Sequence, residues 1–413
     1  MNKNIEDLYR IAQKPARHII GLMSGTSLDG LDVALCRLEG QGEDTKIELV
    51  NFETVDYSEA VKFEIREIFA KQTIDFQHLT LLNAWIGKLH GNMILSCLEK
   101  WGLNTEGVDL VASHGQTVFH TPKILHKIER FDNATLQIGD GDHVAVTTGI
   151  ITVSDFRQKH VAAGGEGAPL AVYGDYFIFS KKDENRILLN MGGIANFTYL
   201  PGSLDASEVF VTDTGPGNTL LDAYTRKFYP NLAYDRDAAL AKQGKIIPEL
   251  LRELKVNEFF QSPFPKTTGP ELFNTLYVDN AIKCGKLGTP LMPTASSSTS
   301  MTVFDLLATL TRFSAETIAE AIKKSFEGKQ INGQFTIYTS GGGAHNPLLI
   351  KHLRELLPNI SLKSTNDLGI NGDAKEAILF AILANECVAG GHTDFGKRAG
   401  VPSVSMGKIS FPN

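Results

Sequence analysis

The amino-acid sequence predicts an α/β protein built from two similar lobes. Its 413 residues are more than one hydrophobic core usually serves, because domains commonly have about 100 to 200 residues. A glycine-containing hairpin pattern in the first part of the chain returns near its middle. After each hairpin, strand patterns alternate with helix patterns, which is typical of α/β architecture. Together these observations indicate a chain made of two similar halves.

Each half is predicted to open with two strands around a turn. In the first pair the turn is polar, and the second strand alternates polar with apolar residues, the period of a half-buried strand. In the second pair the turn consists of Gly192 and Gly193. The predicted strands are residues 17–21 with 31–38, and residues 186–191 with 195–200.

Further strands are predicted at residues 108–113, 209–213 and 335–340. A helix is predicted over residues 304–326, with one apolar face that would pack into the core and carry no chemistry. That face consists of Leu307, Leu310, Ile318 and Ile322.

We expect the lobes to be discontinuous in sequence. The N-terminal lobe is predicted to contain residues 17–150 and about 380–413. The second lobe is predicted to contain residues 151–379, and with them Asp213 and the later glycine turns.

The composition is that of a soluble globular protein, with 42% hydrophobic and 21% charged residues. A net charge of -7 offers no basic field for a nucleic-acid backbone. No stretch has the roughly 18 apolar residues of a membrane span, and the polar start of the chain is unlike a secretion signal. We therefore expect a cytoplasmic protein without nucleic-acid or membrane partners. Its cysteines should be reduced thiols, since Cys36, Cys97, Cys284 and Cys387 lie far apart.

The first candidate site is the turn of the first hairpin, Gly-Leu-Met-Ser-Gly-Thr-Ser-Leu-Asp-Gly-Leu-Asp at residues 21–32. Small residues leave backbone N–H groups accessible, and together with hydroxyl groups such a turn can wrap a phosphate. It lacks the spacing of a P-loop, and an ordinary long hairpin turn is the alternative. The candidate phosphate-binding residues are Gly25, Thr26, Ser27, Leu28, Asp29, Gly30, Leu31 and Asp32.

The second candidate site is Thr-Asp-Thr-Gly-Pro-Gly-Asn at residues 212–218. It places Asp213 at the carboxyl end of a predicted strand, where α/β sheets present reactive groups. A helix is expected to begin near Thr219, and its N-terminus favours anionic ligands. The alternative role for Asp213 is to cap that helix.

The third candidate site is the run Gly341, Gly342 and Gly343 between a strand and a helix. Glycines let the flat base of a nucleoside lie close against the backbone. A tight strand-to-helix turn is the alternative, although a turn does not need three glycines in succession.

Polar clusters at residues 113–117, 155–157 and 164–170 offer donors and acceptors suited to a sugar. Arg157 suits a carboxylate because its planar fork can bind two oxygens at once. A surface ion pair is the alternative for Arg157. His114 could equally be a hydrogen-bonded structural residue.

These motifs resemble those of the anhydro-N-acetylmuramic acid kinases, within the superfamily of actin, hexokinase and the heat-shock ATPases. The resemblance also covers Asn-Met-Gly-Gly at residues 190–193 and Lys-Thr-Thr-Gly at residues 266–269. It implies a two-lobed actin-like ATPase (ribonuclease H-like) fold, with duplicated βββαβαβα halves and a cleft between them.

The resemblance implies an enzyme of cell-wall recycling that uses ATP and Mg²⁺. It would convert 1,6-anhydro-N-acetylmuramic acid, water and ATP into N-acetylmuramic acid 6-phosphate and ADP. Asp213 would be the general base that takes a proton from the attacking water. ATP would lie against Gly192, Gly193 and residues 341–344. A homodimer is also implied.

By the same resemblance, the sugar-binding residues would be Ser113, His114, Gln116, Arg157 and Glu376. Glu376 could instead be a helix-surface residue paired with a nearby lysine. No side chain is predicted to ligate a metal directly, although Asp29 or Asp32 could hold Mg²⁺ through water.

Three positions depart from the family pattern, which commonly has Asp, Gln and Gly there. They are His160, Glu166 and Ala238. These departures leave open a kinase for a different anhydrosugar. A non-catalytic sensor that binds ATP and sugar is the alternative from another class, although Asp213 and the phosphate loop are both present.

Overall fold

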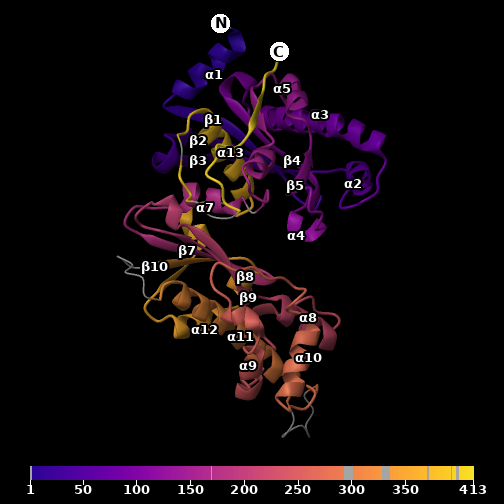
Figure 1. Cartoon of the computed structure of the whole chain (residues 1–413), viewed down its shortest axis with the longest axis vertical. Coiled ribbons are helices and arrows are strands. Elements are labelled where there is room, and N and C mark those ends of the chain that lie inside the picture. Colours follow the sequence, from indigo (N-terminus) through magenta and orange to yellow (C-terminus); the bar gives the residue numbers. More distant parts are fainter. Residues whose placement is uncertain are drawn as a thin grey trace. The chain divides into compact units, whose positions relative to one another are not determined.

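Each predicted hairpin belongs to a β-sheet of its own in the computed structural model of the chain (Figure 1). The structure describes residues 2–168, 170–292, 301–327, 335–369, 372–391, 393–396 and 400–413. The chain divides into two compact units. Unit 1 comprises Met1–Ser180, Leu204–Glu208 and Gly369–Asn413, and unit 2 comprises Lys181–Ser203 and Val209–Leu368.

The sheet of unit 1 has the strand order β12-β6-β4-β1-β2-β3, with β5 paired to β4. Strand β2 pairs antiparallel with β1 on one side and with β3 on the other, whereas β1, β4 and β6 run parallel. The strands are β1 (Ala16–Ser24), β2 (Gly30–Glu39), β3 (Lys46–Asp56), β4 (Leu110–Thr121), β5 (Ala134–Ile138), β6 (Thr152–Ser154) and β12 (Lys408–Ser410).

The sheet of unit 2 has the order β11-β10-β7-β8-β9. Strand β8 pairs antiparallel with β7 on one side and with β9 on the other, and β7, β10 and β11 run parallel. Unit 2 therefore repeats the order and directions of β3-β2-β1-β4-β6, which confirms the predicted α/β fold with duplicated halves. The strands are β7 (Asn185–Met191), β8 (Ile194–Leu200), β9 (Phe210–Pro216), β10 (Phe335–Ser340) and β11 (Ser361–Ser364).

The α-helices of unit 1 include α13, which packs on β1, β2 and β4. Its backbone comes so close to β1 that a Cβ atom on Gly21 would collide with the carbonyl of Ala377. The helices are α1 (Lys3–Gln13), α2 (Glu59–Arg66), α3 (Phe76–Lys100), α4 (Lys123–His126), α5 (Gly141–Thr148), α6 (Phe156–Ala162), α7 (Ala171–Phe179) and α13 (Lys375–Val388).

Helix α11 lies at the centre of unit 2, and the face predicted for it is buried. Leu307, Leu310, Ile318 and Ile322 are each no more than 2% exposed, so this helix packs the core as expected. The helices of unit 2 are α8 (Thr219–Phe228), α9 (Pro248–Leu254), α10 (Thr275–Cys284), α11 (Val303–Ser325) and α12 (Pro347–Leu356).

The division into units differs from the predicted lobes. Residues 151–180 and 369–379, expected in the second lobe, group with unit 1. The reason is physical: β6 pairs with β4, and α13 packs against both β1 and α7. In the described ranges, no helix combines the length and apolar character that crossing a membrane requires.

Candidate active site

The turn between β1 and β2 holds its polar residues outward. Leu28 adopts a left-handed conformation with φ of 59° and is buried in the core of unit 1. Thr26, Ser27 and Asp29 beside it are exposed. The buried leucine therefore anchors the turn and leaves its neighbours accessible to a ligand.

Gln116 on β4 holds this turn through hydrogen bonds to Ser24 and Gly25. Ser24 Oγ donates to Gln116 Oε1 at 2.5 Å, and Gln116 Nε2 donates to the Gly25 carbonyl at 3.1 Å. Ser24 Oγ also lies 2.8 Å from the hydroxyl of Tyr57. Gln116 is fully buried, so in this structure its side chain holds the turn in position.

Replacing Gln116 with leucine should let the turn shift, because its hydrogen bonds to Ser24 and Gly25 are lost, and any turnover that depends on the turn should fall by about tenfold. The melting temperature should also fall, since Ser24 would be left buried without this partner. Steady-state kinetics and a thermal melt measure both effects. Gln13→Leu, on the exposed end of α1, is the matched control, and equal kinetics for the two variants would contradict this role.

Two carboxylates flank the turn. Ser27 Oγ and the Gly30 N–H donate to Asp29 Oδ1 at 2.6 and 3.1 Å, which lowers the pKa of Asp29. Burial raises the pKa of Asp32, although Thr54 Oγ1 donates to it at 2.6 Å. Within the described ranges, no three His, Cys, Asp or Glu side chains are grouped to hold a metal directly.

Arg157, at the start of α6, is held by two acceptors. Its Nε donates to His114 Nε2 at 2.7 Å, and its Nη1 donates to the Gly167 carbonyl at 2.6 Å. The His114 ring packs on Phe380 with centroids 4.5 Å apart. Burial and the nearby Arg157 hold the pKa of His114 well below its usual range, so its ring stays neutral and can accept this bond.

Glu376, in the first turn of α13, lies close enough to Arg157 for the two charges to affect each other. Partial loss of solvation raises the pKa of Glu376, although the side chain remains open to solvent; Asp32 adds to the rise and Arg157 opposes it. Neither Arg157 nor Glu376 forms an ion pair within the part of the chain that the structure describes. Lys375 instead pairs with Asp175 at 2.7 Å, so neither of the surface ion-pair alternatives is seen.

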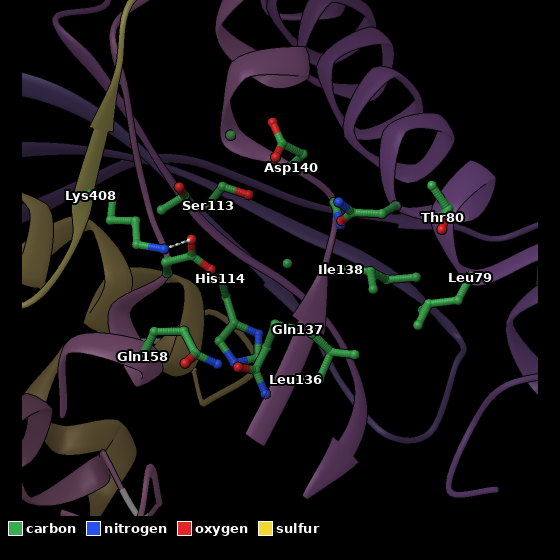
Figure 2. Close-up of a pocket in the computed structure, with 16 residues that line it drawn as sticks. Leu79, Thr80, Ser113, His114, Leu136, Gln137, Ile138, Asp140, Gln158 and Lys408 are labelled. Atoms are coloured by element: carbon green, nitrogen blue, oxygen red, sulfur yellow. Dashed lines mark hydrogen bonds and ion pairs between the residues drawn. The ribbon is translucent and has the colours of Figure 1, made fainter. Parts of the chain in front are cut away.

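A polar cavity of about 520 Å³ in unit 1 brings Ser113 and His114 together (Figure 2). Ser113 Oγ is buried and has no hydrogen-bond partner among the described residues. An ion pair of 2.9 Å between Lys408 and Asp155 forms part of the wall. The hydroxyl of Ser113 is therefore unused at this cavity, next to the helix that carries Arg157.

Asp213 lies in the middle of β9 of unit 2 rather than at the carboxyl end of a strand, as the sequence predicted, because β9 continues to Pro216, which pairs with Ile194 of β8. Its Oδ2 accepts from the Thr268 N–H at 2.8 Å, and its own N–H donates to the Lys266 carbonyl at 2.9 Å. The first residue before α8 is Asn218, so Asp213 does not cap that helix. Burial raises the pKa of Asp213, Glu271 adds to the rise, and the Thr268 N–H opposes it.

The glycine motifs of unit 2 meet beside the end of β7. The N–H groups of Gly217 and Asn218 donate to the carbonyls of Gly193 and Gly192, both at 2.8 Å. Gly341 has φ of 78°, and a Cβ atom there would lie 2.7 Å from the side chain of Asn190. Gly342 and Gly343 continue as a short 3₁₀ helix. Segments far apart in sequence thus form one surface of bare backbone.

A second cavity, of about 490 Å³, adjoins this surface in unit 2. Gly342 and Asn218 form part of its wall, and burial raises the pKa of Asp222 beside them. Most of its lining was not assigned to a site from the sequence, although residues 235–237, 345 and 346 lie beside motifs noted there. The missed residues are Leu221, Asp222, Tyr234, Asp235, Arg236, Asp237, His345 and Asn346.

A model of the anhydro-N-acetylmuramic acid kinase family matches residues 17–410 of the chain. The chain belongs to this family. An anhydro-N-acetylmuramic acid kinase of Pseudoalteromonas atlantica is 56% identical, with 100% of both chains covered. The kinase of Pseudoalteromonas translucida is 52% identical over 100% of both chains, and that of Caldanaerobacter subterraneus is 38% identical over 98% of this chain and 100% of its own.

The three departures from the pattern of the anhydro-N-acetylmuramic acid kinases have different surroundings. Glu166 is exposed. Ala238 is buried with φ of 54°, a left-handed conformation that costs a residue with a Cβ atom about 1 kcal/mol. His160 is fully buried beside the loop that binds Arg157.

Proposed function

We propose that this protein is an ATP-dependent kinase that opens the 1,6-anhydro ring of 1,6-anhydro-N-acetylmuramic acid and phosphorylates O6. The products are N-acetylmuramic acid 6-phosphate and ADP, in peptidoglycan recycling. Membership of the family supports this activity. The single structural observation that carries it is Asp213, a half-buried carboxyl with a raised pKa on strand β9. The proposal includes a cytoplasmic homodimer.

In this reaction, Asp213 takes a proton from water as the water oxygen bonds to the anomeric carbon. The bond from that carbon to O6 breaks, O6 bonds to the γ-phosphorus, and ADP leaves. The Thr268 N–H holds one carboxyl oxygen, which leaves the other free to accept the proton. A carboxylate with a raised pKa is a stronger base, so it accepts a proton from water more readily than an ordinary aspartate does.

The turn between β1 and β2 is suited to the phosphates, because Thr26 and Ser27 expose hydroxyl groups there. Asp29, whose pKa is lowered, and the nearby Asp32 fit a hydrated Mg²⁺ held through water. When bound, Mg²⁺ would offset the charge of the phosphates. The nucleoside would occupy the cavity beside Gly342 in unit 2, where bare backbone can meet a flat base.

For the sugar, Arg157 is the partner of the lactyl carboxylate, since its guanidinium is charged and its Nη2 can donate to a carboxylate oxygen. Glu376 is placed to accept from a hydroxyl group, and Ser113 offers an unused hydroxyl in the adjacent cavity.

A coupled assay of ADP release tests the proposal. With Mg²⁺ and ATP, release should depend on 1,6-anhydro-N-acetylmuramic acid. 1,6-Anhydroglucose, which lacks the lactyl and N-acetyl groups, is the matched comparison. Turnover only with the second sugar would favour a kinase for another anhydrosugar, whereas sugar binding without ADP release would favour a sensor.

A further inference from the structure

The backbone of Gly167 connects a buried histidine to Arg157. Its N–H donates to His160 Nδ1 at 3.0 Å, and its carbonyl accepts from Arg157 Nη1 at 2.6 Å. Gly167 has φ of 85°, and a Cβ atom there would lie 3.0 Å from Thr135 and 3.1 Å from Val161. Only glycine suits this conformation and this space, so the two peptide groups on either side of the Gly167 Cα atom are held in one orientation.

His160 is fitted to this role by its surroundings. The side chain is fully buried, and its ring meets Tyr173 edge-on with centroids 5.6 Å apart. The ring also fills the space above Gly165, where a Cβ atom would collide with it. Burial, with the nearby Arg157, lowers the pKa of His160 to about 4. The ring is therefore neutral, with Nδ1 available as an acceptor and the proton on Nε2.

The guanidinium of Arg157 is engaged along one side only. His114 accepts from Nε and Gly167 accepts from Nη1. Among the described residues no hydrogen bond or ion pair is formed by Nη2. One nitrogen is thus left to a ligand, while the rest of the fork is fixed by neutral acceptors that do not cancel its charge.

We propose that His160 is a positioning residue for Arg157, acting through the backbone of Gly167, and that it sets the preference for a sugar bearing a carboxylate. This inference rests on the proposed function. An aspartate in place of His160 would keep an acceptor but add a negative charge close to Arg157. The neutral histidine keeps the geometry and leaves the full positive charge for the substrate.

The test compares His160→Leu with His160→Asn. Leucine removes the acceptor, whereas the amide oxygen of asparagine can occupy the place of Nδ1. In His160→Leu, the KM for 1,6-anhydro-N-acetylmuramic acid should rise by about tenfold, the effect of loosening a charge-assisted hydrogen bond. The KM for ATP should not change. His160→Asn should behave nearly as the native enzyme does.

Two further readouts separate positioning from a general loss of structure. The ratio of kcat/KM for 1,6-anhydro-N-acetylmuramic acid to that for 1,6-anhydro-N-acetylglucosamine, which lacks the lactyl carboxylate, should fall by about the same factor in His160→Leu. In an Arg157→Lys background the His160 substitution should have little additional effect, because coupled residues are not additive.

Several results would overturn the inference. An unchanged sugar preference in folded His160→Leu would do so, as would full additivity with Arg157→Lys. If the leucine variant does not fold, a folded His160→Asn that loses the preference is equally decisive. If the native enzyme phosphorylates the sugar but the His160 variants contradict the inference, only the role of His160 is overturned and the proposed function stands. A native protein without activity or binding toward either sugar removes both proposals.

Discussion

Asp213→Asn is expected to lower kcat by about 10² to 10⁴-fold, the range for loss of a general base. The amide keeps the shape and can still accept from the Thr268 N–H, but it cannot take a proton from water. The KM for ATP should change little, because Asp213 does not line the cavity beside Gly342. Steady-state kinetics with both substrates measures this pattern.

The stability of Asp213→Asn should not fall. A raised carboxyl pKa means that the folded protein holds the proton more tightly than the unfolded chain, so ionised Asp213 costs folding free energy at neutral pH. Asparagine removes this cost, and denaturant unfolding should show equal or greater stability. Asp222→Asn is the matched control, because it is another aspartate of unit 2 with a raised pKa. It should raise the KM for ATP rather than abolish turnover.

The pH profile follows from the same shift. Because Asp213 must be ionised to accept a proton, kcat/KM should fall as pH drops through its pKa. That midpoint should lie above the ordinary value for aspartate, about 3.9, since burial raises it. An acid limb at or below the ordinary value would contradict the environment described for Asp213.

Arg157→Lys is expected to raise the KM for the sugar by about 10- to 100-fold. Lysine keeps the charge but cannot donate to His114, to the Gly167 carbonyl and to a carboxylate at once. The KM for ATP should stay the same. Arg37→Lys, on the surface of β2 where Arg37 pairs with Glu39 at 2.5 Å, is the control. If both variants keep the native sugar KM, Arg157 does not bind the substrate.

Local patterns predicted the strands of both hairpins and strands at three further places, but not β3, β5, β6, β11 or β12. Residues 335–340 were predicted as a strand, with the bounds that β10 has. The buried face of α11 was predicted from its period. Strand β4 was predicted too short, because its second half is stabilised by pairing with β5, and such pairing leaves no mark on the strand's own sequence.

The hydrogen bonds that hold the site residues in place could not be predicted, since they join residues whose pairing the sequence does not indicate. The hydrogen bond between Gln116 and Ser24 joins residues 92 positions apart, and neither motif indicates the other as its partner. His160 was noticed only as a departure from a family pattern. Its contact with Gly167 depends on a left-handed turn, and a sequence indicates that glycines are present but not where their peptide groups point.

The most direct test of the central claim is the mass of the product formed from 1,6-anhydro-N-acetylmuramic acid, Mg²⁺ and ATP. The account predicts a product heavier than the sugar by one water and one phosphoryl group, formed by the native enzyme and far more slowly by Asp213→Asn. A product heavier by the phosphoryl group alone, or one formed equally well by the variant, would contradict the role of Asp213 as the base that activates water.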